Sequence, residues 1–481
     1  MSADIQTRLP INLIYVQMKL SYKFFLSILL LSVQLLSCKK YVDIKTSSTT
    51  SRLETVEDCQ EILDNYGEMS TGYPSDGEAS ADDYYLDEQG WQYYTVNQED
   101  RNIYGWISGT GRSSADPQWV HPYKTMFYSN LVLEGVEKLK NGADRQTLDQ
   151  LRGAALFFRA YALWNVAQLY AKPYSASTAN VDFGVPIRLT SDVNEVSERG
   201  NLQQSYDRMI RDLDEAVILL SNSSKIQTRP NKAAAYAMLA RVYLSMENYT
   251  LAQTNANLAL QLNSQLMDFN TLDPFAWPSP FERFNKEVIF HSLTTAGHTI
   301  DPGFGSVAYI SDEVVNLYEP NDLRKEYYLD DRGDGVYYFG GSYDAGYDGQ
   351  LFNGLTVDEM YLIRSECYAR ANNITEAMRD LNTLLLTRWA TGTYVDKTAN
   401  SSTEALQIIL TERRKELLMR GQRWTDLRRL NKDNSFRKNL SRSITVGGQT
   451  SNFSLPANDL RYTLLIPQQV IINSGIQQNP R

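Results

Sequence analysis

The residues of this chain that could do chemistry are few, and their spacing predicts no catalytic centre. Its three histidines form no His-Glu-x-x-His pair, and no two stand at a ligand spacing on one helix: His121, His291 and His298. The chain has no Gly-x-Ser-x-Gly elbow and no phosphate-binding loop. The neighbouring carboxylates Asp82-Asp83 and Asp330-Asp331 indicate little, because acid–base pairs act across a cleft. We therefore expect no catalytic residue and no cofactor.

One acidic run in the second half of the chain has residue types that bind a cation. Its aspartates could hold calcium through oxygen ligands: Asp330, Asp331, Asp334, Asp344 and Asp348. The run lacks the register of a twelve-residue calcium loop and has no bidentate glutamate. Solvated loop charge is the favoured interpretation, and we predict no metal site.

Aromatic side chains are the more informative group, with 31 tyrosines and 7 tryptophans. Exposed Tyr and Trp rings offer a flat apolar face with a polar tip, which suits sugar or peptide ligands. The alternative for any single ring is the core, to which we assign Trp164 and Trp424. Six rings that fall in stretches without helical periodicity are the candidate ligand contacts: Trp91, Tyr94, Trp106, Trp277, Tyr338 and Tyr347.

The elements that must position these rings are predominantly helical. Apolar residues at helical spacing predict helices over residues 56–66, 119–139, 148–171 and 205–220. Residues 232–260 and 361–384 each match the tetratricopeptide pattern of two antiparallel helices, with an Ala nine positions after a Tyr (252 − 243 and 377 − 368). The copies lie 125 positions apart (368 − 243), so we expect an interrupted array.

Two regions between the helices change in composition. Residues 71–114 and 271–354 are rich in Gly, Pro, Asp and Tyr and predict loops and short strands. The predicted fold is therefore mostly α: a single large α-helical domain over residues 53–481, in which tetratricopeptide-like helix pairs form a scaffold that carries irregular insertions. Such a scaffold with long loops is a common layout for a binding protein.

The overall composition excludes some partners. The 481 residues are 42% hydrophobic and 22% charged, as in a globular protein. A formal net charge of −10 argues against a nucleic-acid surface, which needs clustered Lys and Arg. Of the three cysteines, Cys59 and Cys367 are too few and too far apart for a disulfide framework, so we expect free buried thiols.

The N-terminus has the layout of a secretory signal. An apolar run over residues 24–36 follows Lys19 and Lys23 and is too short to cross a bilayer as a helix. It ends in Leu-Leu-Ser-Cys38, which resembles a bacterial lipobox; the alternative is an ordinary signal with a chance cysteine. We expect residues 1–37 to be a signal peptide with its true start at Met18. Cys38 is then lipidated, and residues 38–52 form a tether that anchors the protein without spanning the membrane.

Five further segments, in order along the chain, resemble the SusD/RagB family of nutrient-binding outer-membrane lipoproteins. They are the helix Gly153–Tyr170, Gly184–Ile187, Glu359–Glu366 (EMYLIRSE), the ERRKEL…GQRWTDL segment over residues 412–427, and Ile466–Gln468 with Gln478–Pro480. Met419-Arg420 replaces a frequent acidic residue, and the tail lacks a final Gly-Tyr. We interpret the helical residues Arg423, Trp424 and Asp426 as structural braces joined by charge-assisted hydrogen bonds, not as a ligand site.

The resemblance implies a non-enzymatic surface protein at the outer membrane, facing the cell exterior. It would capture oligosaccharides and pass them to a SusC-like TonB-dependent transporter. Two alternatives stay open: a lipoprotein that captures peptides for import, and a tetratricopeptide-like scaffold that binds a partner protein. A surface glycosidase would need two carboxylates facing each other across an aromatic cleft. If the two insertions meet in one aromatic patch, the oligosaccharide-capture reading gains support.

Overall fold

Helices dominate the part of the chain that the computed structural model describes, which comprises residues 53–93, 95–109, 111–115, 117–296, 307–345 and 350–481. The long helices of the first half follow the predicted segments: α2 (Val56–Leu63), α7 (Pro117–Leu139), α8 (Arg145–Tyr170), α9 (Leu202–Leu219), α10 (Lys232–Ser245) and α11 (Tyr249–Leu262). None of these described helices combines the length and apolarity that a membrane crossing demands. The predicted mostly α fold is confirmed.

Polar caps fix where these helices begin. Helix α8 starts three residues before the predicted segment because the carboxylate of Asp144 accepts a hydrogen bond from the backbone N–H of Thr147 at 2.9 Å. Helix α9 begins with a capping box, in which the side chains of Asn201 and Gln204 each accept the other residue's backbone N–H. Caps of this kind add about 1 kcal/mol each to helix stability.

The two predicted tetratricopeptide copies are α10–α11 and α14 (Val357–Arg370) with α15 (Ile374–Leu385). Their turns are the same: a left-handed residue with φ of 60°, Glu247 or Asn372, precedes the asparagine that caps the second helix. The small residues Ala252 and Ala377 are fully buried, so the paired helices approach closely. The repeat and its register are confirmed.

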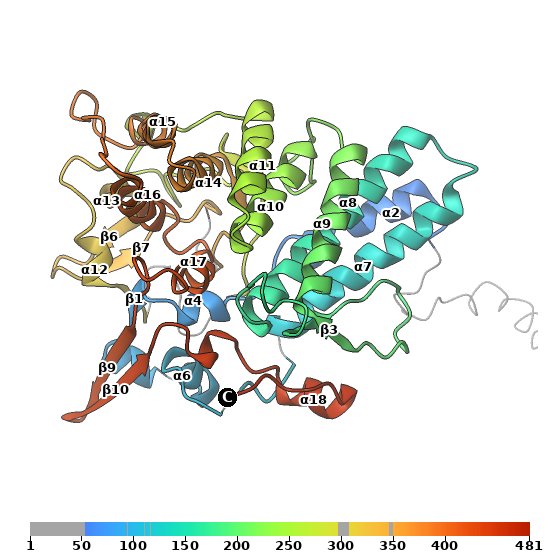
Figure 1. Cartoon of the computed structure of the whole chain (residues 1–481), viewed down its shortest axis with the longest axis horizontal. Helices are drawn as coiled ribbons and strands as arrows, with labels where there is room; N and C mark the ends of the chain where they lie inside the picture. The colour runs from blue at the N-terminus through green and yellow to red at the C-terminus, as the bar shows by residue number, and fades with distance from the viewer. Residues whose placement is uncertain (1–52, 94, 110, 116, 297–306, 346–349) are drawn as a thin grey trace, which may run out of the picture. The chain divides into compact units, whose positions relative to one another are not determined.

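The helices pack in sequence order, α7 on α8, α8 on α9, α9 on α10, and α11 directly on α14 (Figure 1). We expected an array interrupted between the two copies. The interruption exists only along the chain, because the intervening residues loop out and let the second copy stack on the first. Helix α16 (Ser402–Glu416) packs on both helices of the second copy, whereas α17 (Arg423–Leu430) packs on α4 (Asp76–Ser80) and α10.

The first insertion contains more helix than predicted. It holds α4 (Asp76–Ser80), α5 (Glu88–Gln92) and α6 (Gln98–Tyr104), besides the short strand β1 (Tyr84–Tyr85), and it follows the short helix α3 (Tyr66–Met69). These helices have four to seven residues, which is too short for a 3.6-residue apolar period to show in the sequence. The prediction of loops and short strands was wrong on this point.

The second insertion has the predicted short strands, with two short helices among them. Antiparallel pairs join β4 (Val288–Phe290) to β8 (Leu355–Thr356) and β6 (Leu329–Asp331) to β7 (Tyr337–Phe339). Strand β5 (Tyr309–Ile310) pairs with β1 of the first insertion. The helices are α12 (Asp312–Val315) and α13 (Arg324–Tyr328). Elsewhere β2 (Phe183–Pro186) pairs with β3 (Arg199–Asn201), and β9 (Leu440–Val446) with β10 (Gln449–Leu455), before α18 (Gln468–Ser474).

The core holds the residues that the sequence assigned to it. Trp164 and Trp424 are buried at 2% and 1% exposure, as predicted. Cys59 and Cys367 are buried and free, also as predicted. Burial raises the pKa of the Cys59 thiol to about 11, so this group is an inert core thiol at neutral pH.

Candidate ligand-binding site

The two insertions meet at a bridge between Tyr73 and Thr294 and through one strand pair. In the antiparallel pair of β1 and β5, Tyr85 lies opposite Tyr309, although 224 positions (309 − 85) separate them along the chain. The backbone N–H of Ser311 extends this junction with a hydrogen bond to the carbonyl of Asp83 at 2.9 Å. Strand β7 packs against β5 in turn. Figure 1 shows the blue β1 beside the yellow β6–β7 hairpin.

Three tyrosine rings form a continuous row across this junction. The ring centroids of Tyr85 and Tyr309 are 5.6 Å apart, and those of Tyr309 and Tyr338 are 5.4 Å apart. Tyr309 is buried in the middle, and its two neighbours are half-buried, so the ends of the row are accessible. We call these three rings together with Arg332 the aromatic face.

Arg332 lies over the rings of Tyr309 and Tyr338 and holds them in place. Its guanidinium carbon is 5.4 Å from the ring centroid of Tyr309 and 6.0 Å from that of Tyr338, and its Nη1 donates a hydrogen bond to the Tyr309 hydroxyl at 2.9 Å. A guanidinium over a ring contributes roughly 0.5–1 kcal/mol at an exposed site. Held in this way, the rings form a preorganised surface for a ligand.

Carboxylates surround the aromatic face. Burial raises the pKa of Tyr85, and the nearby charges of Asp312, Asp87 and Asp334 raise it further. Burial likewise raises the pKa of Tyr309 to about 12, with Asp87 adding to the shift. Both phenols are therefore neutral at pH 7 and can donate hydrogen bonds. Stacking rings, hydroxyl donors and carboxylate acceptors are the groups that a hydroxyl-rich ligand uses.

Helix α5 is held against this junction by a close backbone approach. A side chain at Gly90 would place its Cβ 2.3 Å from the carbonyl oxygen of Val307, so only glycine fits there. Asp87 caps this helix by accepting the N–H of Gly90 at 2.7 Å. Trp91 follows on the same helix, half-buried between the rings of Tyr104 and Phe453.

The predicted ligand-contact residues have different placements. Tyr338 belongs to the aromatic face, and Trp91 lies on the helix that Gly90 fixes beside it. Trp277 is 85% exposed on the loop before β4. Trp106, for which we expected exposure, is 4% exposed and donates its indole N–H to the carbonyl of Ser80 at 2.9 Å, so it is a core residue. Tyr94 and Tyr347 lie outside the described residues, as does Cys38.

Sequence reasoning missed Tyr85, Tyr309 and Arg332. Tyr84-Tyr85 lies in the insertion that we singled out, but nothing in the sequence tells that it pairs with Tyr309. The stretch Val307–Ile310 ahead of Ser311 has the apolar character of a short strand, and this signal could have drawn attention to Tyr309.

The acidic run does not converge on one point. Asp330, Asp331 and Asp334 are exposed, in agreement with solvated loop charge. Asp344 is instead fully buried, with a carboxylate oxygen 2.8 Å from Nε of Arg283. Asp348 lies outside the described residues. Asp344 was thus wrongly grouped with solvated charge, because an arginine pairs with it in the interior.

A second charged region lies in the interior, and we call it the ionic core. It contains three buried carboxylates within 4.8 Å of one another, Glu287, Asp358 and Glu416, and the arginines that neutralise them: Arg324, Arg388 and Arg420. Arg388 contacts both Glu287 and Glu416 at 2.8 Å, and Arg420 contacts Asp358 at 2.7 Å. Charges this deeply buried need such pairing. The ionic core ties β4, α14, α16 and the segment before α17 together.

The family-like segments found in the sequence also make buried ion pairs. Arg413 donates to Asp426 at 2.8 Å, and Arg423 donates to Asp82 of the first insertion at 2.6 Å. Glu366 accepts two hydrogen bonds from Arg429, at 2.6 and 2.8 Å. The interpretation as structural braces is confirmed for Arg423 and Asp426, whereas Trp424 contributes by burial and not by a hydrogen bond within the described residues.

Comparisons with known proteins agree with this architecture. A SusD-like family model, described as starch-binding associating with outer membrane, matches residues 40–244, and the SusD family model matches residues 357–481. A SusD superfamily protein from Bacteroides thetaiotaomicron is 23% identical, with 89% of this chain and 100% of that one covered and a TM-score of 0.68. No curated protein matches the chain.

Two solved structures from Bacteroides vulgatus are similar in the same way. A SusD superfamily protein is 20% identical over 89% of this chain and 99% of its own, with a TM-score of 0.68. A SusD-like carbohydrate binding protein is 19% identical over 88% of this chain and 97% of its own, with a TM-score of 0.66. At these identities the likeness shows the shared fold.

Proposed function

Since the chain belongs to the SusD family, we propose that it is a nutrient-binding protein that captures oligosaccharides on the aromatic face. The role is binding and not catalysis. A solved structure of the same fold is described as a SusD-like carbohydrate binding protein, and the family model over the N-terminal part is described as starch-binding.

The observation that carries this proposal is the pairing of β1 with β5. It brings Tyr85 of one insertion and Tyr309 and Tyr338 of the other into one row, with Arg332 over it. A helical scaffold that only bound a partner protein would not need two distant insertions to assemble an aromatic surface. Tyrosine rings with their hydroxyl groups and neighbouring carboxylates match the apolar ring faces and the hydroxyl edges of sugars.

We further propose that residues 1–37 are removed as a signal peptide and that Cys38 carries a lipid anchor. The tether over residues 38–52 would then connect the anchor to the unit Leu53–Arg481. The description of the matching family model, which associates its members with the outer membrane, supports this location. The protein would face the cell exterior and pass its ligand to a SusC-like TonB-dependent transporter.

A binding panel tests the ligand class. The full chain in detergent would be titrated with neutral oligosaccharides of several linkages and with short peptides, and tryptophan fluorescence and calorimetry would report binding. Saturable binding of one oligosaccharide class, weakened in a Tyr338→Ala variant, supports the proposal. Saturable binding of peptides alone would replace it with peptide capture.

The transporter partnership needs a separate experiment. Purification of the tagged chain from its native membrane, without cross-linker, should recover an outer-membrane barrel in constant ratio. A Cys38→Ser variant should lose membrane attachment and label from radioactive palmitate. Recovery of this variant in the membrane with label intact would refute the anchor.

A further inference from the structure

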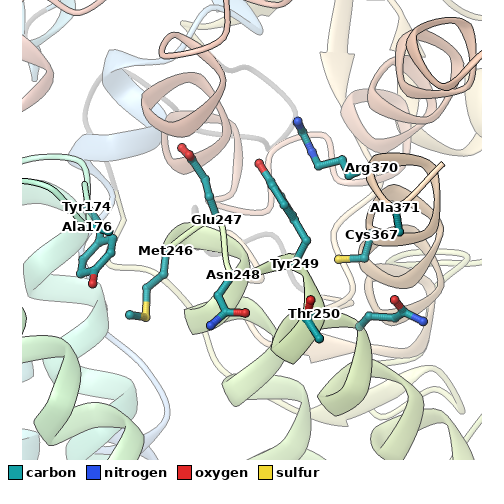
Figure 2. A pocket seen from close by; sticks show the side chains of 11 residues that line it. Tyr174, Ala176, Met246, Glu247, Asn248, Tyr249, Thr250, Cys367, Arg370 and Ala371 are labelled. Carbon is teal, nitrogen blue, oxygen red and sulfur yellow. The ribbon is translucent and has the colours of Figure 1, made fainter.

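A cavity lies where the two helix-pair copies stack, and the proposed function does not use it. Its volume is about 510 Å³, within the range of small-molecule sites. Its walls come from the turn between α10 and α11, the end of α14 and the loop that follows α8. We call it the repeat pocket. Figure 2 shows Tyr174 and Met246 on one side and Cys367 and Arg370 on the other, with the ring of Tyr249 between Glu247 and Arg370.

Arg370 is held rigidly in the wall of the repeat pocket. Its Nε donates a hydrogen bond to the buried carboxylate of Glu366 at 2.9 Å, and its guanidinium carbon lies 4.5 Å from the ring centroid of Tyr249. The ring of Phe436 is a second aromatic neighbour, at 5.8 Å. Its side chain is 13% exposed, so it is fixed but still reachable.

The two terminal nitrogens of Arg370 donate no hydrogen bond to the residues that the structure describes, although Nη1 forms a long ion pair with Asp433. Within the part of the chain that the structure describes, Nε is the atom of this side chain that donates a hydrogen bond, and Nη1 approaches Asp433 to 3.8 Å. Glu366 does not depend on these nitrogens, because Arg429 already donates to both of its oxygens. A rigid guanidinium with a free edge is the group that pairs with a planar carboxylate through two parallel hydrogen bonds.

The turn between α10 and α11 contains a residue, Glu247, whose type is disfavoured in the backbone conformation that it adopts. Glu247 adopts the left-handed conformation with φ of 60°, where the second copy has Asn372, a residue that tolerates it better. The carboxylate of Glu247 forms an ion pair with Lys432, whose Nζ also donates to the carbonyl of Tyr174 at 2.6 Å. The strained glutamate thus fastens two walls of the repeat pocket to each other.

We propose that the repeat pocket binds a ligand through a carboxylate, with Arg370 as the residue that recognises it. Apolar parts of the ligand would lie against Met246 and Tyr249, and the amide of Gln253 and the hydroxyl of Thr250 would supply further hydrogen bonds. A phosphate group carries close to two negative charges. The carboxylate of Glu247 lines the pocket, and that of Asp433 lies 3.8 Å from Nη1 of Arg370. Both negative charges disfavour that dianion and favour a monoanionic carboxylate.

A carboxylate of this kind has two sources, the free C-terminus of a short peptide and a uronic acid residue of a sugar. Two matched ligand pairs distinguish them: a tripeptide with a free or an amidated C-terminus, and a disaccharide that ends in glucuronate or glucose. Calorimetric titration of the full chain in detergent gives each dissociation constant. The proposal expects one acidic member to bind at least about tenfold more tightly than its neutral partner.

Variants separate recognition from folding. Arg370→Lys keeps the positive charge but loses the planar guanidinium fork, so the affinity for the acidic ligand should fall at least about tenfold. The midpoint temperature of thermal unfolding should stay within about a degree of that of the unchanged chain. Arg379→Lys on the exposed side of α15 is the matched control and should change neither. Tyr338→Ala should leave this binding unchanged. Equal affinity for acidic and neutral members, no binding of either acidic ligand at about 5 mM, or full affinity in Arg370→Lys would overturn the proposal.

Discussion

Two regions of this protein place arginines beside carboxylates and aromatic rings. They differ in how exposed the arginine is and in how much of its hydrogen-bonding capacity the fold already uses. In the ionic core Arg388 is fully buried and donates to Glu287, to Glu416 and to backbone oxygen. On the aromatic face Arg332 is 39% exposed, stacks on two tyrosines and lies 3.6 Å from Asp334. Burial with saturated hydrogen bonds indicates a structural role, whereas a partly exposed, rigid and incompletely used group indicates a binding role.

The largest effect should come from breaking the ionic core. Arg388→Met leaves Glu287 and Glu416 buried without their shared cation, and losing one partner of a buried pair costs about 3–5 kcal/mol. Arg332→Met is the matched control and should change the free energy of unfolding by no more than about 1 kcal/mol, because it removes only contacts at a partly exposed site. Urea denaturation monitored by tryptophan fluorescence measures both. Similar losses in the two variants would remove the distinction between the regions.

A pH-dependent effect of intermediate size is expected at Glu78 on α4. Burial, with a contribution from Asp83, raises the pKa of this carboxyl from 4.5 to about 8, while one oxygen accepts the N–H of Gly421 at 2.7 Å. The folded state therefore holds the proton more tightly than the unfolded state. The stability that it contributes is complete below about pH 4.5 and is lost as the pH rises through 8.

Glu78→Gln should reduce the slope of the free energy of unfolding against pH by up to about 1.4 kcal/mol per pH unit between pH 6 and 8. Urea midpoints at four pH values measure it, and Glu57→Gln on the exposed side of α2 is the control. Glu287, whose pKa burial raises to about 7, adds a residual slope of the same sign. An unchanged slope in Glu78→Gln would show that Glu78 does not carry the linkage.

A smaller effect should separate the two sides of β7. Tyr338→Ala removes one ring of the aromatic face and should weaken oligosaccharide binding about tenfold, or roughly 1.4 kcal/mol. Tyr337→Ala, the adjacent residue, points to the opposite side of the strand toward Lys325 and should leave affinity within about twofold. Fluorescence titration at constant salt measures both. The aromatic face is contradicted if Tyr337→Ala is the more damaging change.

The smallest effect concerns ligand charge. Three carboxylates and one arginine surround Tyr85. In an Arg370→Lys variant, which removes carboxylate recognition from the repeat pocket, an acidic oligosaccharide should therefore bind about threefold to tenfold more weakly than its neutral counterpart at about 10 mM salt. The difference should shrink at about 150 mM salt, where the Debye length falls to about 8 Å. Asp334→Asn should reduce the difference in affinity between the acidic and the neutral oligosaccharide at low salt. A preference of the Arg370→Lys variant for the acidic ligand would count against this electrostatic account of the aromatic face.

The sequence predicted the helical half of the molecule well because its signals are local. The alanine and tyrosine spacing of the two copies fixed their register to the residue, and the asparagines that cap α11 and α15 stand at equivalent positions. The stacking of α11 on α14 was not predictable, since the intervening insertion separates them in the sequence and not in space.

The candidate site was harder to predict because it depends on contacts between distant segments. Tyr338 was named from composition alone, but Tyr85 and Tyr309 become neighbours only through a strand pair of two residues. Trp106 and Trp91 lie in the same insertion and could not be distinguished from the sequence. Trp106 is nevertheless buried, with the guanidinium of Arg442 over its ring and its indole N–H donating to the carbonyl of Ser80. Composition indicates which residue types suit a ligand, and the fold decides which of them remain accessible.

The most direct test of the central claim is hydrogen exchange with a bound neutral oligosaccharide. The account predicts slower exchange in peptides that contain Tyr84–Tyr85, residues 307–311 and residues 329–339, and no change around Arg370 in the repeat pocket. Protection confined to α10–α11 and α14, with none at the aromatic face, would contradict the claim that the joined insertions capture the ligand.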